Sequence, residues 1–339
     1  MPKNDHYVII GNGPAGNHAA DVLRKNDPKA RITIISDEGF PFYYRHKLCD
    51  FIAGKTNEQG LKARNYQEYK DKNIRMRLGQ RVEKIDPENR VLYLKHMEKV
   101  GYSKLILSTG ATHRIIPAVA GFEKYVSFMI CYQDALLLKQ EIKKIKNAVV
   151  LGGDLISLKF TKMLAKIGIQ VTLFLYRECF WPFDMTKDMS EQVADSIKGP
   201  QITPLTDDYI VSVSGDENPY TVMTQSGQNL KTDRLFSFMG MMPNIDFIVG
   251  SGIDTEKGVL VDEFLRTNYK DVYACGDCAQ IYNPDYNDYW ISIGWENARI
   301  QGETAAYNLL GDHRVIKPAK SNILKVEGLN VNTSWWKEI

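Results

Sequence analysis

The spacing of apolar and polar positions at the start of the chain predicts a strand, a turn, a helix and a second strand. Residues 7–10 are an apolar run rich in β-branched side chains, as expected for a buried parallel strand. A glycine-rich turn follows at once, residues 17–25 have the spacing of a helix, and residues 31–35 form the next apolar run. This order predicts the first half of a Rossmann-type unit.

The same pattern returns after residue 147. Residues 148–151 predict a strand, residues 155–167 a helix, and residues 170–175 a further strand. We therefore expect an α/β fold with two Rossmann-type domains.

The first turn has the full dinucleotide-binding pattern. Gly11 permits the tight turn, Gly13 lets the backbone approach a pyrophosphate, and Gly16 lets the helix pack closely on the strand. The phosphates would lie at the helix N-terminus, where free N–H groups and the helix dipole favour an anion. Two acids, Asp37 and Glu38, follow the second predicted strand, and either could bond the ribose of an adenosine.

The second turn departs from this pattern. Asp154 stands where a glycine would let a pyrophosphate approach, and its carboxylate would crowd and repel a diphosphate. Ser157 replaces the packing glycine, and Leu175 ends the second strand, so the ribose acid is missing. We interpret Gly152, Gly153, Asp154 and Ser157 as a degenerate NAD(P) site, and favour a structural Rossmann domain over nucleotide binding there.

Composition narrows the functional classes. The 339 residues carry a net charge of only +2, so nothing indicates nucleic-acid binding. Apolar runs fall short of the ~20 residues of a membrane helix, and the first residues do not read as a signal peptide. The five scattered cysteines fit a reducing cytoplasm, and the six histidines form no metal-binding pattern, so we expect no metal.

Three later segments resemble the pyridine nucleotide-disulfide oxidoreductase superfamily. Residues 102–111, Y-S-K-L-I-L-S-T-G-A, look like its second FAD fingerprint, and residues 267–277, T-N-Y-K-D-V-Y-A-C-G-D, like its late FAD motif. Residues 239–244, M-G-M-M-P-N, look like the turn that leads back from an inserted domain. With the two turns in order, the resemblance covers about residues 6–330 and implies a glutathione reductase-like fold, the second domain inserted in the first.

Residues 40–54, F-P-F-Y-Y-R-H-K-L-C-D-F-I-A-G, are similar to a segment of bacterial NADH:rubredoxin reductases and of the flavoprotein part of assimilatory nitrite reductases. The C-x-x-x-x-C pair of the disulfide reductases is missing here, which excludes their mechanism. The resemblance implies an FAD-binding domain at 1–118 and 245–320, an NAD(P)-binding-like domain at 119–244, and a tail at 321–339 in place of a C-terminal domain.

The resemblance also implies a set of FAD-binding residues. Asp277 would accept a hydrogen bond from the ribityl chain, and the helix that starts at Trp295 would point its N-terminus at the flavin pyrimidine. Arg45 and Lys47 would lie near the flavin or its diphosphate, unless they are solvated surface residues. The expected set is Gly11, Gly13, Pro14, Ala15, Gly16, Asp37, Glu38, Arg45, Lys47, Val82, Ser108, Thr109, Gly110, Gly276, Asp277, Trp295, Glu296 and Asn297.

The catalytic residue stays unknown, with Cys49 and Asp50 as candidates close to the flavin. Asp50 takes the place of a lysine that several relatives hold near flavin N5, and Cys49 is a single thiol that could be redox-active. Lys159 stands where relatives usually have a glutamate near the nicotinamide. Cys275 and Cys278 lack further ligands at metal-binding spacing, so we interpret them as structural.

The expected function is an FAD-dependent oxidoreductase that exchanges electrons with a redox protein. One alternative is a reductase that uses NAD(P)H to reduce rubredoxin or a similar protein. Another is an FAD subunit of a larger complex with an iron–sulfur subunit, without NAD(P)H, and a third is a silent flavin-bound scaffold. Trp335 and Trp336 either pack on the body or anchor a partner, which could be a second copy of this chain.

Overall fold

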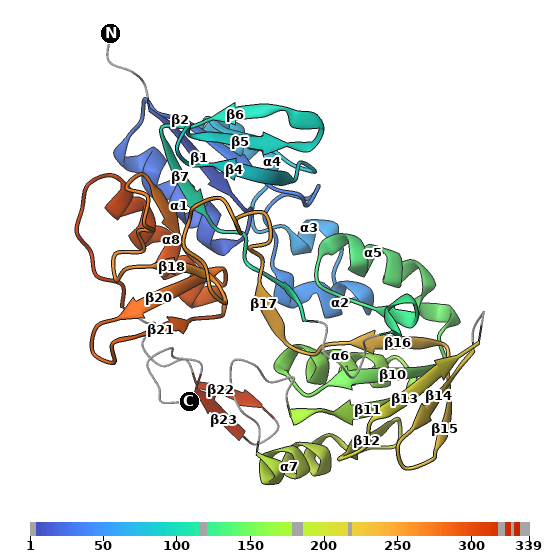
Figure 1. The fold of residues 1–339 in the computed structure, drawn as a ribbon. Coiled ribbons are helices and arrows are strands. Elements are labelled where there is room, and N and C mark those ends of the chain that lie inside the picture. Colours follow the sequence, from blue (N-terminus) through green and yellow to red (C-terminus); the bar gives the residue numbers. More distant parts are fainter. Residues whose placement is uncertain are drawn as a thin grey trace.

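A computed structural model of the chain describes residues 5–114, 121–177, 186–215, 219–317, 323–326 and 329–332. Figure 1 shows two lobes, each built around a parallel sheet. Trp335 and Trp336 lie outside the described residues, as does the expected boundary at 118–119, and the expected domain limits stay predictions.

The first lobe holds a five-stranded parallel sheet in the order β19-β7-β1-β2-β3. Its strands are β1 (His6–Ile10), β2 (Arg31–Ile35), β3 (Ile74–Arg77), β7 (Lys104–Leu107) and β19 (Val272–Ala274). The four strands other than β3 are mostly apolar and buried, as in sheets covered on both faces, whereas the edge strand β3 carries Arg75 and Arg77. The strand from residue 272 pairs with β7, so a late segment completes a sheet begun at the N-terminus.

Two helices pack together in this lobe, α1 (Pro14–Asn26) and α8 (Trp295–Leu309). A Cβ at Gly302 would lie 2.1 Å from the carbonyl oxygen of Ala15, so only glycine allows this approach. Two small sheets complete the lobe. They are formed by β4 (Val82–Asp86), β5 (Val91–Leu94) and β6 (Lys99–Gly101), and by β18 (Val259–Val261), β20 (Ala279–Asn283) and β21 (Asp288–Ile291).

The second lobe holds another parallel sheet, in the order β12-β11-β10-β16-β9. Its strands are β9 (Val126–Ser127), β10 (Asn147–Gly152), β11 (Gln170–Leu175), β12 (Ile202–Thr206) and β16 (Arg234–Ser237). Strand β10 alternates in burial: Ala148 and Val150 join one apolar core, and Val149 and Leu151 another.

Different layers cover the two faces of this sheet. The first core includes α5 (Tyr132–Glu141), α6 (Leu155–Lys166) and α7 (Lys187–Ile197), together with α2 (Leu48–Ile52) from the N-terminal part. The second core includes the antiparallel strands β13 (Ile210–Ser214), β14 (Tyr220–Thr224) and β15 (Asn229–Thr232). Because α2 lies in the helix-side core, the segment after the first βαβ unit also holds the two lobes together.

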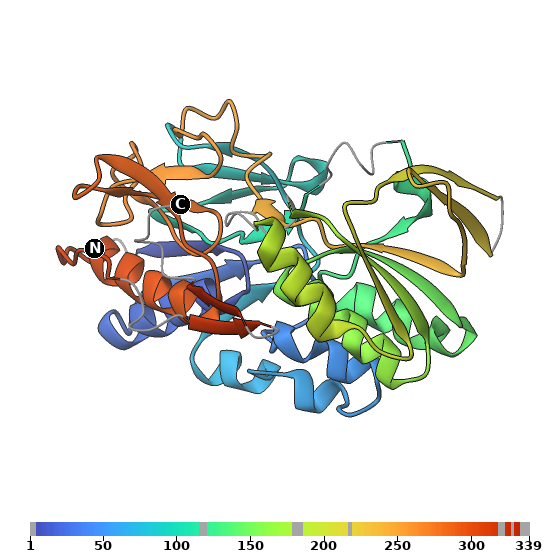
Figure 2. The same cartoon turned by 90° about the horizontal axis from the view of Figure 1, so that it is seen from below.

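Short elements make the connections. Strands β8 (Ala111–His113) and β17 (Met241–Pro243) pair where the chain passes between the lobes, and Figure 2 shows the lobes side by side from below. The η1 turn (Arg45–Lys47) and α3 (Glu58–Leu61) contact α2, whereas α4 (Tyr66–Asp71) packs on β3. Near the C-terminus, β22 (Ile323–Val326) and β23 (Leu329–Asn332) form an antiparallel hairpin.

Candidate functional site

The glycines of the first turn divide into two kinds. Gly11 has a φ of +113°, and a Cβ there would lie 2.0 Å from the Ser108 carbonyl oxygen. A Cβ at Gly16 would lie 2.2 Å from the Gly11 carbonyl oxygen, whereas a Cβ at Gly13 would meet no atom within 4 Å. The outer glycines are therefore required by the packing of the protein itself, and Gly13 borders open space, as a position that faces a ligand would.

The N-terminus of α1 is open to a ligand. Gly13 is its N-cap residue and provides no side-chain hydrogen bond, and Pro14 and Ala15 open the helix. No acid lies in the first turn. The free N–H groups and the helix dipole therefore favour an anion such as the diphosphate of FAD.

Next to this turn is a small cleft. Its lining includes Gly11, Asp37, Val82 and Thr109. Asp37 is exposed, whereas Glu38 accepts hydrogen bonds from the Tyr43 hydroxyl at 2.7 Å and from Arg45 at 2.5 Å. The structure therefore favours Asp37 over Glu38 for a ribose.

The turn after β7 is joined to the chain that returns from the second lobe. The Ser108 hydroxyl donates to the Ile10 carbonyl oxygen at 2.9 Å, and the Thr109 hydroxyl donates to the Asn244 carbonyl oxygen at 2.7 Å. Gly110 has a φ of +67°, a conformation that glycine adopts without strain. The three predicted residues 108–110 thus lie beside the first glycine turn.

Asp277 has the polar atom that points most clearly to a ligand site. Its Oδ1 atom is buried and has no hydrogen-bond partner, and burial raises the pKa of this carboxyl to about 6. The backbone N–H of the preceding Gly276 donates to Gln301 Oε1 at 2.7 Å, while Gln301 Nε2 and the Ser292 hydroxyl are also buried without partners. Buried polar atoms without partners are rare and costly, so these residues fit a ligand that carries hydroxyl groups, such as the ribityl chain of FAD.

Helix α8 also begins with an open N-terminus. Gly294 provides no side-chain cap, and the Trp295 ring stacks on Phe42 with 5.2 Å between ring centroids. Glu296 forms an ion pair with Arg299 at 2.6 Å, and Asn297 donates to the Ile293 carbonyl oxygen at 3.0 Å. Glu296 and Asn297 are therefore engaged by their own helix, and their role toward the cofactor stays a prediction.

The buried side-chain amide of Asn17, which the sequence analysis missed, hydrogen-bonds the backbone of the first turn. Asn17 is fully buried, and its Nδ2 atom donates to the Asn12 and Gly13 carbonyl oxygens at 3.0 Å. Its Oδ1 atom accepts from the Tyr69 hydroxyl at 2.7 Å and from Arg64 at 3.2 Å. An asparagine at the fourth position of a helix was the available signal, because asparagine is a poor helix former unless its amide is used.

The second turn caps its own helix. Asp154 is the N-cap of α6, and its carboxylate accepts a hydrogen bond from the Ser157 N–H at 2.7 Å. The Ser157 hydroxyl accepts from the Gly153 N–H at 2.9 Å and donates to the Asp154 carbonyl oxygen at 2.8 Å. A Cβ at Gly152 would lie 2.5 Å from the Ser157 Cβ. Two N–H groups of this turn therefore bond within the protein, and a carboxylate lies where a diphosphate would.

The candidate residues in and near α2 are buried or lie close to other groups of the protein. Cys49 is buried, and burial raises the pKa of its thiol to about 11, which opposes a thiolate at neutral pH. Asp50 lies 3.8 Å from the Lys55 amine. The Lys47 amine lies 4.4 Å from the Tyr44 ring centroid, and Lys159 donates to the His46 carbonyl oxygen at 2.5 Å.

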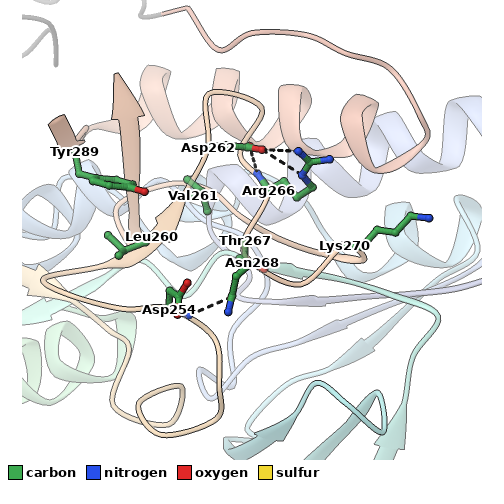
Figure 3. Close-up of a pocket in the computed structure, with 9 residues that line it drawn as sticks. All are labelled: Asp254, Leu260, Val261, Asp262, Arg266, Thr267, Asn268, Lys270 and Tyr289. Atoms are coloured by element: carbon green, nitrogen blue, oxygen red, sulfur yellow. Dashed lines mark hydrogen bonds and ion pairs between the residues drawn. The ribbon is translucent and has the colours of Figure 1, made fainter. Parts of the chain in front are cut away.

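A separate surface pocket lies away from these turns (Figure 3). It is lined by residues of the β18 region, among them Asp262 and Arg266, which pair with each other at 2.9 Å. Because Asp262 and Arg266 satisfy each other, we assign the pocket no ligand. Within the described ranges, no cluster of three metal-binding side chains occurs, and no helix is both long and apolar enough to cross a membrane.

Comparison with known proteins decides the family. The family model for pyridine nucleotide-disulphide oxidoreductases matches residues 5–302. The chain belongs to this family.

Two curated relatives are similar over most of this oxidoreductase. NADH-rubredoxin oxidoreductase of Clostridium acetobutylicum is 29% identical over 331 residues, which cover 97% of this chain and 81% of the relative. Rubredoxin-NAD(+) reductase of Pseudomonas putida is 26% identical over 306 residues, covering 90% and 80%. A crystal structure of a ferredoxin reductase from Rhodopseudomonas palustris matches with a TM-score of 0.83 at 25% identity, covering 93% of this chain and 78% of that one.

These findings confirm the predicted family, the two-domain Rossmann fold and the assignment as an FAD-dependent oxidoreductase. They give no support to the alternative of a flavoprotein that does not use NAD(P)H. The individual cofactor-binding residues stay predictions, each now with a defined place in the fold.

Proposed function

We propose that this oxidoreductase takes electrons from NAD(P)H through FAD and passes them to a small iron-containing redox protein, with rubredoxin as the first candidate. The proposal rests on two observations taken together: the open N-terminus of α1, and the Oδ1 atom of Asp277, which is buried without a hydrogen-bond partner. The choice of NAD(P)H as electron donor and rubredoxin as electron acceptor follows the names of two relatives, which are both rubredoxin reductases. The four cysteines within the described residues are free thiols, which fits a cytoplasmic setting.

The residues of the chain have distinct roles in this proposal. Bound FAD would supply the chemistry of accepting a hydride and releasing single electrons. The N–H groups at the start of α1 would bind its diphosphate, Asp37 its ribose, and Asp277 its ribityl hydroxyls. The uncapped start of α8 would stabilise negative charge on the cofactor.

The second lobe would bind NAD(P)H weakly. Asp154 and Ser157 bond the N–H groups of the turn, and the carboxylate repels a diphosphate. We therefore expect reduction by NAD(P)H to need a high nucleotide concentration.

The test is an anaerobic titration of the purified yellow protein. Flavin absorbance near ~450 nm is followed with NADH and then NADPH, and the reduced protein is mixed with oxidised rubredoxin. We expect complete bleaching at high nucleotide concentration and rapid reoxidation by rubredoxin. A protein that binds no added FAD, or a reduced flavin that neither rubredoxin nor a ferredoxin reoxidises, would contradict the proposal.

A further inference from the structure

The segment from the last turn of α5 to the end of α6 carries an uneven share of the positive charge. Residues 139–166 contain seven lysines, no arginine and two acids, which gives +5, against +2 for the whole chain. The rest of the chain therefore carries −3. The two acids serve the fold: Glu141 pairs with Arg234, and Asp154 caps α6.

Two of these lysines contact α2 or the turn before it. Lys139 of α5 places its amine 3.8 Å from the centroid of the Phe51 ring, and Lys159 of α6 bonds the His46 carbonyl oxygen just before α2. Figure 1 shows α2 beside both helices. Lys159 is followed by Lys162 and Lys166 at i+3 and i+7, so all three share one face of α6, and all three are exposed. We name Lys55, Lys139, Lys159, Lys162 and Lys166 the basic face.

The acids near the basic face are engaged. Asp50 lies beside the Lys55 amine, and Glu58 accepts from the Tyr132 hydroxyl at 2.5 Å. Asp134 accepts from the Ile130 and Cys131 N–H groups, both at 2.9 Å. Asp50 therefore offsets the charge of Lys55, whereas Glu58 and Asp134 are held by the fold and do not offset Lys139, Lys159 or Lys166.

We propose that the basic face docks the acidic surface of the redox protein that this oxidoreductase reduces. This inference rests on the proposed function and adds the place and charge of the partner. The face surrounds α2, the helix with the flavin-proximal candidates Cys49 and Asp50, so a partner docked there would lie beside the segment expected near the flavin. A patch of one sign steers an oppositely charged protein and speeds its association.

The composition of the face favours a protein over a nucleic acid. All its cations are lysines, whereas phosphate recognition favours the bidentate guanidinium of arginine. An exposed apolar side chain, Ile156, lies three residues before Lys159 on α6 and offers apolar contact at an interface.

The first test compares two charge-reversed proteins. Lys162→Glu with Lys166→Glu reverses two charges on the basic face. As the control, Lys257→Glu with Lys270→Glu reverses two exposed lysines elsewhere, Lys257 just before β18 and Lys270 at the pocket of Figure 3. Each photoreduced protein is mixed with oxidised rubredoxin from Clostridium acetobutylicum, and the second-order rate of flavin reoxidation is measured between low and high salt.

We expect the wild-type rate to fall by about tenfold as salt rises, because salt screens the steering field. The basic-face variant should react about tenfold more slowly at low salt and match the wild type at high salt, with the control within about twofold throughout. Equal rates for the two variants would overturn the docking proposal.

Zero-length carbodiimide cross-linking separates docking from electron transfer. It joins lysines to carboxylates in contact, so mass spectrometry should map cross-links from rubredoxin to Lys139, Lys162 or Lys166. If rubredoxin accepts no electrons but cross-links there, the proposed function fails and the docking face stands. Cross-links found only elsewhere, or lysine-dependent binding to phosphatidylglycerol vesicles in place of rubredoxin, would overturn the docking face.

Discussion

Gly11 and Gly13 lie two residues apart, yet an added methyl group should have opposite effects at the two positions. In Gly11→Ala, the Cβ would lie 2.0 Å from a backbone carbonyl oxygen, so we expect the FAD-free protein to lose more than about 3 kcal/mol of stability. Gly13→Ala meets no protein atom and should cost about 0.5–1 kcal/mol as a weaker N-cap.

Denaturation without FAD and FAD titration measure these two effects separately. Gly13→Ala should fold and yet bind FAD at least about tenfold more weakly, because its methyl group lies where the diphosphate would approach. Unchanged FAD affinity in Gly13→Ala would remove the first turn from the cofactor site.

Asp277 should make the FAD-free protein sensitive to pH. Burial raises the pKa of its carboxyl from 3.8 to about 6, so the folded state holds the proton more tightly than the unfolded state. The resulting stabilisation is fully present below pH 4 and is lost as pH rises through 6, a loss of about 3 kcal/mol.

Urea denaturation of the FAD-free protein tests this. Asp277→Asn should be more stable than the wild type at pH 8 and similar at pH 4, while Asp285→Asn, an exposed acid, should show no such pattern. FAD affinity of the wild type should rise between pH 5 and pH 7 if hydroxyl donors bind the ionised carboxylate. A stability difference between Asp277→Asn and the wild type that is independent of pH would contradict this explanation.

Local patterns and long-range contacts differ in how well the sequence predicts them. The lack of room for a side chain at Gly11 and Gly16 follows from the strand–turn–helix geometry. The glycine pattern therefore predicted it. The choice of Asp37 over Glu38 depends on Tyr43 and Arg45, and the role of Asn17 depends on Tyr69, 52 residues away. No spacing rule reports such contacts.

At the scale of elements, the residues that replace the dinucleotide-binding glycines at the start of α6, Asp154 and Ser157, stabilise that helix. Asp154→Gly with Ser157→Gly removes the cap and should cost about 1–2 kcal/mol. It should also tighten NAD(P)H binding by about tenfold, since the N–H groups become free and the carboxylate is gone. Thr186→Gly removes the cap of α7, away from the turn, and should cost stability without changing nucleotide affinity.

Thermal denaturation and NADH titration compare these proteins. Equal nucleotide affinity in wild type and double variant would show that the cap is not what weakens the site.

The same cap predicts how nucleotide binding depends on pH. Burial raises the pKa of Asp154 to about 6, so its carboxyl becomes neutral as pH falls below 6. The neutral form repels a diphosphate less, and NAD⁺ affinity of the wild type should increase from pH 8 to pH 5. Isothermal titration should show proton uptake on binding, and Asp154→Gly should show none from this group. Weaker binding at low pH in the wild type only would contradict the assignment.

Element boundaries followed the hydrophobic pattern where strands are buried. The predicted strands at 31–35 and 170–175 match β2 and β11 at both ends. Helix α1 starts at Pro14, three residues before the predicted start, because proline is well suited to the first helical position and Gly16 packs inside the first turn. The apolar period begins only after these residues, so periodicity alone placed the start too late.

At the scale of the whole molecule, segments far apart in sequence meet at one place. Strand β19 pairs with β7, Gly302 of α8 packs on Ala15 of α1, and Thr109 bonds Asn244. The family resemblance predicted that these segments belong to one FAD-binding domain, but it predicted none of these individual contacts. It did not anticipate that α2 packs on α5 and α6, because that contact depends on how the two lobes are oriented.

This convergence makes a prediction about the FAD-free and FAD-bound protein. One ligand at the meeting point should protect the turn at 10–16, the segment at 107–110, and residues 275–278 with the start of α8 together, although they span most of the chain. Ligand binding to the native state stabilises it by about 2.7 kcal/mol at a free concentration 100 times the dissociation constant, which is enough to slow amide exchange in all three segments. Strands β13, β14 and β15 cover the far face of the second sheet and should change least. Hydrogen–deuterium exchange with and without FAD measures the protection of each segment. NAD⁺ is then used as a second ligand, and it should protect the start of α6 only in the Asp154→Gly, Ser157→Gly variant. Protection limited to one of the three segments would mean that they do not form a single cofactor site.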